Sequence, residues 1–103
     1  MSTATDIEVQ IDEKIKDLIS EPRRYHVIFL NDEVTPMEWV IELLTLIFKH
    51  TYSQAEHLTL TIHSEGSAVV GTYSYEVAEQ KCIEASKASK EQGFPLKIQL
   101  EEE

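Results

Sequence analysis

The stretch YHVIFLNDEVTPMEWV, from Tyr25 to Val40, decides how the rest of the chain is arranged. Its first six residues, Tyr25–Leu30, are apolar and rich in β-branched and aromatic side chains, which predicts one buried strand. Three polar residues then follow without a break: Asn31, Asp32 and Glu33. Two carboxylates and an amide are therefore expected on a short loop that leaves the strand.

The next residues predict the start of a helix. Thr35 can cap it, Pro36 suits the first helical position, and Glu38 completes a capping box. Apolar residues at spacings of three and four extend the helix to about His50. A loop held between two rigid elements can fix ligand groups in place, and the helix N-terminus favours ionised carboxylates. Such a fixed anionic loop favours a cationic ligand.

Downstream, the sequence predicts two further helices and two further strands. They are a helix from Ser53 to Gly66, a strand over Ala68–Tyr73, a helix from Ser74 to about Gln92 and a strand over Leu96–Leu100. Ser53 and Glu56 suggest a capping box, Gly66 a left-handed cap, and Gly71 a bulge or close backbone approach. The predicted fold class is α+β: a small three-stranded antiparallel sheet packed against three helices, in the order β-α-α-β-α-β.

Composition divides the chain into two parts. Residues 1–22 mix acidic and scattered apolar residues and end in Glu21-Pro22, which predicts a flexible N-terminal extension, either simply solvated or used to engage a partner. Residues 23–103 are expected to form one small domain.

Charge and cysteine content narrow the class of protein. A net charge of -10 argues against nucleic acid and favours cationic partners. No apolar run is long enough to span a membrane. The single cysteine, Cys82, has no partner within the chain, so a reducing compartment and a cytoplasmic location are expected.

The sequence carries no recognisable catalytic or metal-binding motif. It has no Gly-x-Ser-x-Gly and no glycine-rich phosphate loop, and its histidines lack metal-site spacing. The chain is therefore expected to be no enzyme and to need no cofactor or metal. Taken alone, Asp32 and Glu33 fit a helix-entry turn, and His63 fits an ordinary structural or surface histidine.

Four blocks of the sequence, taken together, indicate more than any of these residues does alone. The blocks LNDEVTPMEWV (30–40), IHSEG (62–66), GTYSYEVAEQK (71–81) and GFPLKIQLE (93–101) resemble, in order and spacing, the ClpS family of adaptors of the Clp AAA+ protease. The resemblance covers about residues 24–102. It implies a monomeric adaptor that binds the free α-amino group and a bulky first residue (Leu, Phe, Tyr or Trp) of substrate proteins. The adaptor then delivers them to a ClpA-type unfoldase.

The resemblance also implies roles for individual residues. The α-amino group would be bound by Asn31, Asp32, Glu33 and His63. The pocket for the first side chain would be lined by Thr35, Met37, Val40, Thr59, Ile62 and Leu96. Glu76 and Lys81 would face the unfoldase, and the arm before residue 23 would act in substrate hand-off. An ammonium group has three donors, which an amide oxygen, a carboxylate and a neutral imidazole can accept.

Two positions depart from the family's usual pattern. Glu33 stands where Asp is more common, so its carboxylate reaches further and can bind through water or from another rotamer. Thr59 stands where many members have Met, which suggests a smaller, more polar pocket wall with room for Trp or Tyr. Met37 matches the family residue that helps exclude Ile and Val.

Two other readings remain open at this stage. One is an adaptor that modulates the unfoldase's choice of substrates without binding N-terminal residues. The other is a structural α+β domain of the same topology, which would not require this polar loop.

Overall fold

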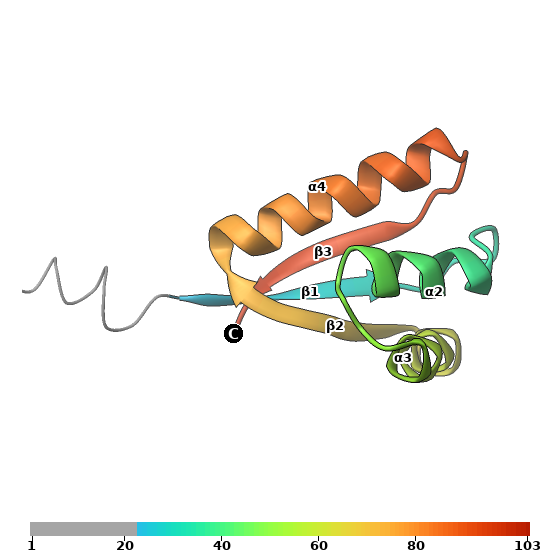
Figure 1. Ribbon diagram of the computed structural model, residues 1–103, viewed down its shortest axis with the longest axis horizontal. Helices are drawn as coiled ribbons and strands as arrows, with labels where there is room; N and C mark the ends of the chain where they lie inside the picture. Colours follow the sequence, from blue (N-terminus) through green and yellow to red (C-terminus); the bar gives the residue numbers. More distant parts are fainter. Residues whose placement is uncertain (1–22) are drawn as a thin grey trace, which may run out of the picture.

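The computed structural model describes residues 23–103, so the predicted N-terminal extension lies outside the described residues. The elements are β1 (Arg24–Leu30), α2 (Met37–Leu46), α3 (Tyr52–Glu65), β2 (Ser67–Ser74), α4 (Tyr75–Glu91) and β3 (Lys97–Glu102) (Figure 1). Both strand pairings are antiparallel, and the strands lie in the order β2-β1-β3. The predicted α+β fold and its element order are confirmed.

The sheet carries one irregularity, at the predicted glycine. Val27 pairs with Gly71 and Ile28 with Val69, so Val70 bulges between them and is buried. A side chain at position 71 would collide with the ring of Tyr73, so only glycine fits there without a shift. The predicted bulge is confirmed, and the group that approaches Gly71 closely is the Tyr73 side chain and not another backbone segment.

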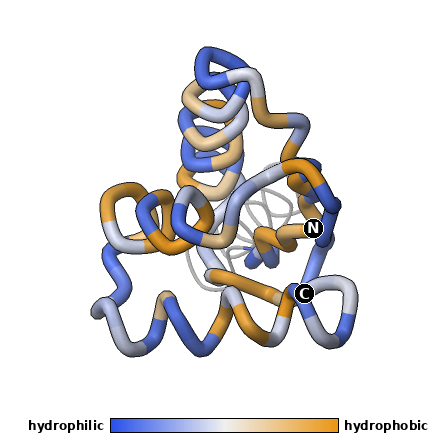
Figure 2. The backbone as a smooth tube through the Cα atoms, turned by 90° about the vertical axis from the view of Figure 1, so that its right-hand side faces the viewer, coloured by the Kyte–Doolittle hydropathy of each residue, from blue (hydrophilic) through white to orange (hydrophobic). Residues whose placement is uncertain are grey.

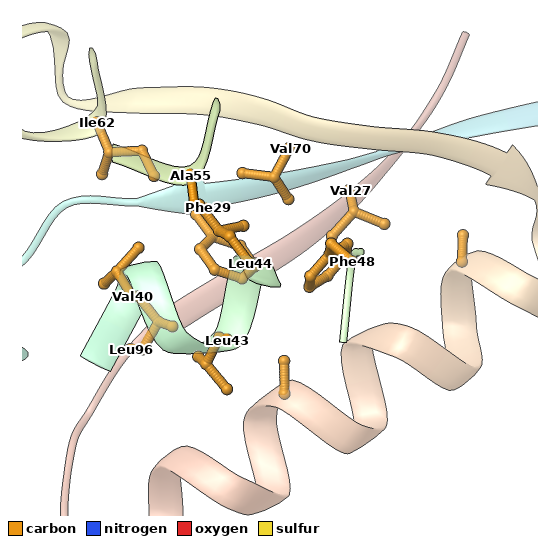
Figure 3. Packing of buried hydrophobic residues seen from close by; sticks show 12 residues of the cluster. Val27, Phe29, Val40, Leu43, Leu44, Phe48, Ala55, Ile62, Val70 and Leu96 are labelled. Carbon is orange, nitrogen blue, oxygen red and sulfur yellow. The ribbon is translucent and has the colours of Figure 1, made fainter. Parts of the chain in front are cut away.

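The core lies between one face of the sheet and the three helices. Val27 and Phe29 alternate toward this face of β1 and are fully buried. They belong to one hydrophobic cluster with residues of every helix, including Leu44 of α2, Ala55 of α3 and Ala85 of α4 (Figure 3). Within residues 23–103 the helices therefore cover one face of the sheet, as predicted.

The start of α2 differs from the prediction. Pro36 is the N-cap, in an extended conformation, and no side chain caps the helix. Thr35 instead donates its hydroxyl to Asp32, three residues earlier. The predicted Thr35–Glu38 capping box was therefore wrong, because Pro36 occupies the N-cap position and Thr35 lies one residue before it.

The connection between α2 and α3 also differs. The predicted end at His50 was wrong: α2 ends at Leu46, and Lys49 adopts a positive φ of 60°, which no continuing helix allows. The capping box of α3 is formed by Thr51 and Gln54, two residues before the predicted Ser53–Glu56 pair. Gly66 ends α3 in the left-handed conformation, as predicted.

Two other boundaries are close to the predictions. Ser74 is the N-cap of α4, although its side chain makes no capping hydrogen bond. β3 runs on to Glu102, where it pairs with the start of β1.

Figure 2 shows hydrophobic and hydrophilic residues alternating along the elements. No helix within residues 23–103 is long and apolar enough to cross a membrane.

Candidate functional site

Asp32 holds the loop after β1 in one shape. Its Oδ1 accepts hydrogen bonds from the backbone N–H groups of Val34 (2.8 Å) and Thr35 (2.7 Å), and its Oδ2 accepts from the Thr35 hydroxyl (2.7 Å). Partial burial acts to raise the pKa of Asp32, but the hydrogen bonds from Thr35 and Val34 and the charge of Lys97 outweigh it and lower the pKa. Asp32 is therefore ionised at neutral pH and is engaged by its own loop.

The same loop is joined to the end of α3. The backbone N–H of Asn31 donates to the carbonyl of Gly66 over 2.8 Å, directly after the turn that ends α3. His63 lies in the last turn of that helix. The side chains of Asn31, Glu33 and His63 are all exposed to solvent. The fold thus brings the polar loop and the end of α3, which carries His63, to the same end of the sheet, with Asn31, Glu33 and His63 all exposed.

The predicted pocket residues come from three separate segments. Val40, Thr59, Ile62 and Leu96 are buried, Thr35 is half-buried, and Met37 keeps 37% of its surface exposed. Figure 3 shows Val40, Ile62 and Leu96 at one end of the core cluster, contributed by α2, α3 and the segment before β3. Met37 is in the first turn of α2, at the end of the helix nearest the polar loop.

Thr59 contributes differently from what its residue type suggests. Its hydroxyl donates to the carbonyl of Ala55, four residues earlier, over 2.7 Å. The donor of this hydroxyl is therefore used inside α3, while its oxygen can still accept a hydrogen bond. The expectation of a smaller, more polar pocket wall at Thr59 stays a prediction.

The residues predicted to face an unfoldase lie at the other end of the sheet. β1 pairs at its end with Ser67 and at its start with Ser74, the residue that precedes α4 (Figure 1). Glu76 is exposed in the first turn of α4, near the start of β1 and opposite the polar loop. Lys81 is half-buried and donates to the backbone carbonyl of Ile47 over 2.7 Å.

A separate groove carries none of the predicted site residues. It has a volume of about 660 Å³, lies between α4 and β3, and is lined by Cys82, Ile83, Ser86, Lys87, Lys90, Glu91 and Ile98. Burial, and then the charge of Glu79, raise the pKa of the Cys82 thiol, which therefore stays protonated at neutral pH. Within residues 23–103 no cluster of three or more potential metal ligands is found.

Two features of this region were missed from the sequence. The first is the role of Asp32 as the acceptor that shapes the loop, for which the Asp-x-Val-Thr spacing of an Asx turn was an available signal. The second is Ser89, which is fully buried and accepts a hydrogen bond from Trp39 of α2 over 2.9 Å. No local pattern signals a contact across fifty residues.

Comparisons with known proteins agree with this geometry. The family described as "ATP-dependent Clp protease adaptor protein ClpS" matches residues 20–99. The ClpS adapter protein of Wolinella succinogenes is 41% identical over 102 residues, covering 99% of this chain and 98% of the relative. The ClpS adapter protein of Escherichia coli O127:H6 is 38% identical over 96 residues, covering 93% and 91%.

A solved structure is similar in fold as well as in sequence. Agrobacterium tumefaciens ClpS2 bound to L-phenylalaninamide has a TM-score of 0.77 and 39% identity, covering 80% of this chain and 99% of that one. The residues matched by the family, 20–99, include the polar loop, the start of α2 and the end of α3. The chain belongs to the ClpS family of adaptor proteins of the ATP-dependent Clp protease.

Proposed function

We propose that this protein is a monomeric adaptor, and no enzyme, that captures proteins by a free N-terminal Leu, Phe, Tyr or Trp and delivers them to a ClpA-type AAA+ unfoldase. The observation that carries the proposal is the bound ligand of the similar ClpS2 structure. L-Phenylalaninamide offers little more than an ammonium group, an aromatic side chain and one amide. The proposed site of this delivery is the cytoplasm, a reducing compartment in which the free cysteine Cys82 stays reduced.

Three exposed side chains suit the ammonium group. One acceptor for each donor of a protonated amine is available from the amide oxygen of Asn31, the carboxylate of Glu33 and an imidazole nitrogen of His63. Asp32 supports them indirectly, since both of its oxygens already accept hydrogen bonds from the loop. We therefore assign Asp32 to positioning Asn31 and Glu33 rather than to direct contact with the amine.

Binding energies explain why both the ammonium-binding residues and the pocket for the first side chain are needed. Burying a Leu or Phe side chain contributes about 1.5–3 kcal/mol. Millimolar affinity alone needs about 4 kcal/mol, so the pocket does not hold a peptide by itself. Hydrogen bonds to a charged group add about 1.5–3 kcal/mol each. An internal peptide segment has no ammonium group and loses this second contribution, which gives selectivity for chain ends.

The pocket is expected to reject β-branched first residues. Met37 is exposed in the first turn of α2, one turn before the buried Val40, and it matches the family residue that helps exclude a branch at Cβ. We expect a peptide that begins with Val or Ile to bind at least about fivefold more weakly than the same peptide beginning with Leu. Fluorescence anisotropy with labelled peptides checks this; equal binding of the Val and Leu peptides would contradict the assignment of Met37.

The unfoldase surface can be tested apart from the pocket. Glu76 is exposed and lies at the opposite end of β1 from the polar loop. Charge reversal in Glu76→Lys is expected to slow adaptor-dependent degradation about threefold or more and to leave peptide affinity unchanged. Glu84→Lys, an exposed carboxylate two turns further along α4, is the matched control. Equal loss of delivery in both variants would indicate a nonspecific charge effect.

Delivery itself tests the proposed function. A folded reporter with an N-terminal Phe is incubated with a ClpA-type unfoldase, its peptidase and ATP, with and without this protein. The proposal predicts that degradation depends on the adaptor and is inhibited by excess L-phenylalaninamide. Degradation that proceeds equally without the adaptor, or that ignores the competitor, would contradict it and favour an adaptor that only modulates other substrates.

A further inference from the structure

Two polar contacts tie α2 to α4, one near each end of α2. In the first turn of α2, the indole N–H of Trp39 donates to the Ser89 hydroxyl over 2.9 Å. Beyond the last turn, the ammonium group of Lys81 donates to the backbone carbonyl of Ile47 over 2.7 Å. In each of the two hydrogen bonds, the donor and the acceptor lie far apart in the sequence. α4 therefore holds the helix that carries the pocket residues of the proposed function at both ends.

The hydrogen bond at the start of α2 is made by a buried hydroxyl group, which acts both as an acceptor and as a donor. Ser89 keeps 1% of its surface exposed and also donates its hydroxyl to the carbonyl of Ala85 over 2.8 Å. The ring of Trp39 packs on Phe94, with 5.7 Å between the ring centroids. Because the donor and the acceptor of this hydroxyl are both engaged, the position of Trp39 is closely defined.

The contact at the end of α2 replaces a missing cap. α2 has no basic residue in its last turn, although its carbonyl end favours a cation. Lys81 supplies that charge from α4, and its ammonium group lies 5.7 Å from the Phe48 ring centroid and 5.3 Å from that of Tyr73. The ammonium group of Lys81 is partly buried and is held by one carbonyl and two aromatic rings, so its position is more restricted than that of a solvated surface lysine.

We propose that Lys81 is a positioning residue for the peptide pocket, acting through the carbonyl of Ile47, the C-cap residue of α2. The inference rests on the proposed function. Lys81 also belongs to the surface proposed to face the unfoldase. Its ammonium group has three donors and uses one of them for Ile47, so it can hold α2 and bind a partner carboxylate at the same time.

The test compares three variants of the full chain in a titration with a labelled peptide that begins with Phe. Lys81→Met keeps the aliphatic stem and removes the ammonium group, and we expect it to weaken binding about fivefold. Lys81→Arg restores a cation and is expected to bind within about twofold of the original protein. Lys87→Met, an exposed lysine of the same helix, is the matched control and should leave affinity unchanged.

Hydrogen exchange provides a readout of α2 itself. The amide of Ile47 donates to Leu43 and that of His50 to Leu44 at the end of α2. We expect peptide binding to slow exchange of these amides in the original protein and in Lys81→Arg, but not in Lys81→Met.

The outcomes separate the two proposals. If the original protein binds the peptide and Lys81→Met binds equally well, the positioning role is wrong and the proposed function stands. If Lys87→Met weakens binding as much as Lys81→Met, the effect is one of net charge, which also overturns the positioning role. If the original protein fails to bind the free Phe terminus, the proposed function fails and the inference fails with it.

Discussion

Replacing His63 with alanine is expected to lower the affinity for a peptide with a free N-terminal Phe at least tenfold while the domain stays folded. One hydrogen bond to an ammonium group contributes about 1.5–3 kcal/mol, and a factor of ten corresponds to about 1.4 kcal/mol. His63 is exposed at the end of α3, so its removal leaves no cavity in the core. Anisotropy titration measures the affinity, and thermal unfolding followed by circular dichroism checks the fold.

His57→Ala is the control for this substitution. His57 is exposed on the same helix, six residues before His63, and lies in a surface hollow with His50 and Leu58. We expect its removal to leave peptide affinity within about twofold of the original. An unchanged titration for His63→Ala would remove this side chain from the ammonium site.

Replacing Asp32 with alanine is expected to weaken peptide binding on the order of thirtyfold, through the loop rather than through a lost contact with the ligand. The substitution removes the acceptor of three hydrogen bonds, from the Val34 and Thr35 amides and the Thr35 hydroxyl. Without them Asn31 and Glu33 are no longer held together, and the ammonium site loses its preorganised geometry. Isothermal titration calorimetry with the Phe peptide measures the loss.

Asp32→Asn is the matched variant, because its Oδ1 still accepts from both amides while the charge and the second acceptor are lost. We expect it to bind between the original protein and Asp32→Ala. Equal affinity for the alanine variant and the original would show that the loop keeps its shape without Asp32. A greater loss in Asp32→Asn than in Asp32→Ala would contradict the positioning role as well.

The ionisation of Asp32 gives these variants a pH signature. Its pKa in the folded protein lies below the ordinary value of 3.8, because the hydrogen bonds to Thr35 and Val34 outweigh the opposite effect of burial. A carboxyl group with a lowered pKa stabilises the fold fully above its ordinary pKa and loses that contribution as the pH falls through the lowered value. The stability difference between the original protein and Asp32→Asn is therefore expected to be constant at neutral pH and to shrink only in strong acid.

Much of the fold followed from local signals in the sequence. The left-handed cap at Gly66 and the bulge at Gly71 were predicted because each needs a glycine for a simple steric reason. The alternation of Ile98 and Leu100 with polar neighbours identified a strand with one face toward the core. These features depend on residues close together in the chain, so no knowledge of the tertiary structure was needed.

The predictions that were wrong concern the starts of α2 and α3, where more than one residue is suited to cap the helix. Thr35 is a good helix cap by type, but it belongs to the turn shaped by Asp32, and the helix starts after Pro36 without a side-chain cap. Thr51 and Ser53 both precede suitable partners, and Thr51 is the one that caps α3. Such competitions are decided by small energy differences that residue types alone do not reveal.

The site residues were named through the family pattern, while several of their interactions required the structure. Asp32 is occupied by its own loop, and the hydroxyl of Thr59 donates to Ala55. The contact of Lys81 with Ile47 joins positions 34 residues apart. Contacts of this kind depend on how α2, α3 and α4 pack on the sheet, and no periodicity or spacing in the sequence encodes them directly.

The central claim is that the polar loop and His63 bind a free α-amino group while the adjoining pocket takes the first side chain. The most direct test is fluorescence anisotropy with two labelled peptides that differ only in acetylation of an N-terminal Phe. We predict micromolar or tighter binding of the free peptide and at least a hundredfold loss on acetylation, since acetylation removes the charge and most of the donors. Equal binding of the two peptides, or binding of neither, would contradict the claim.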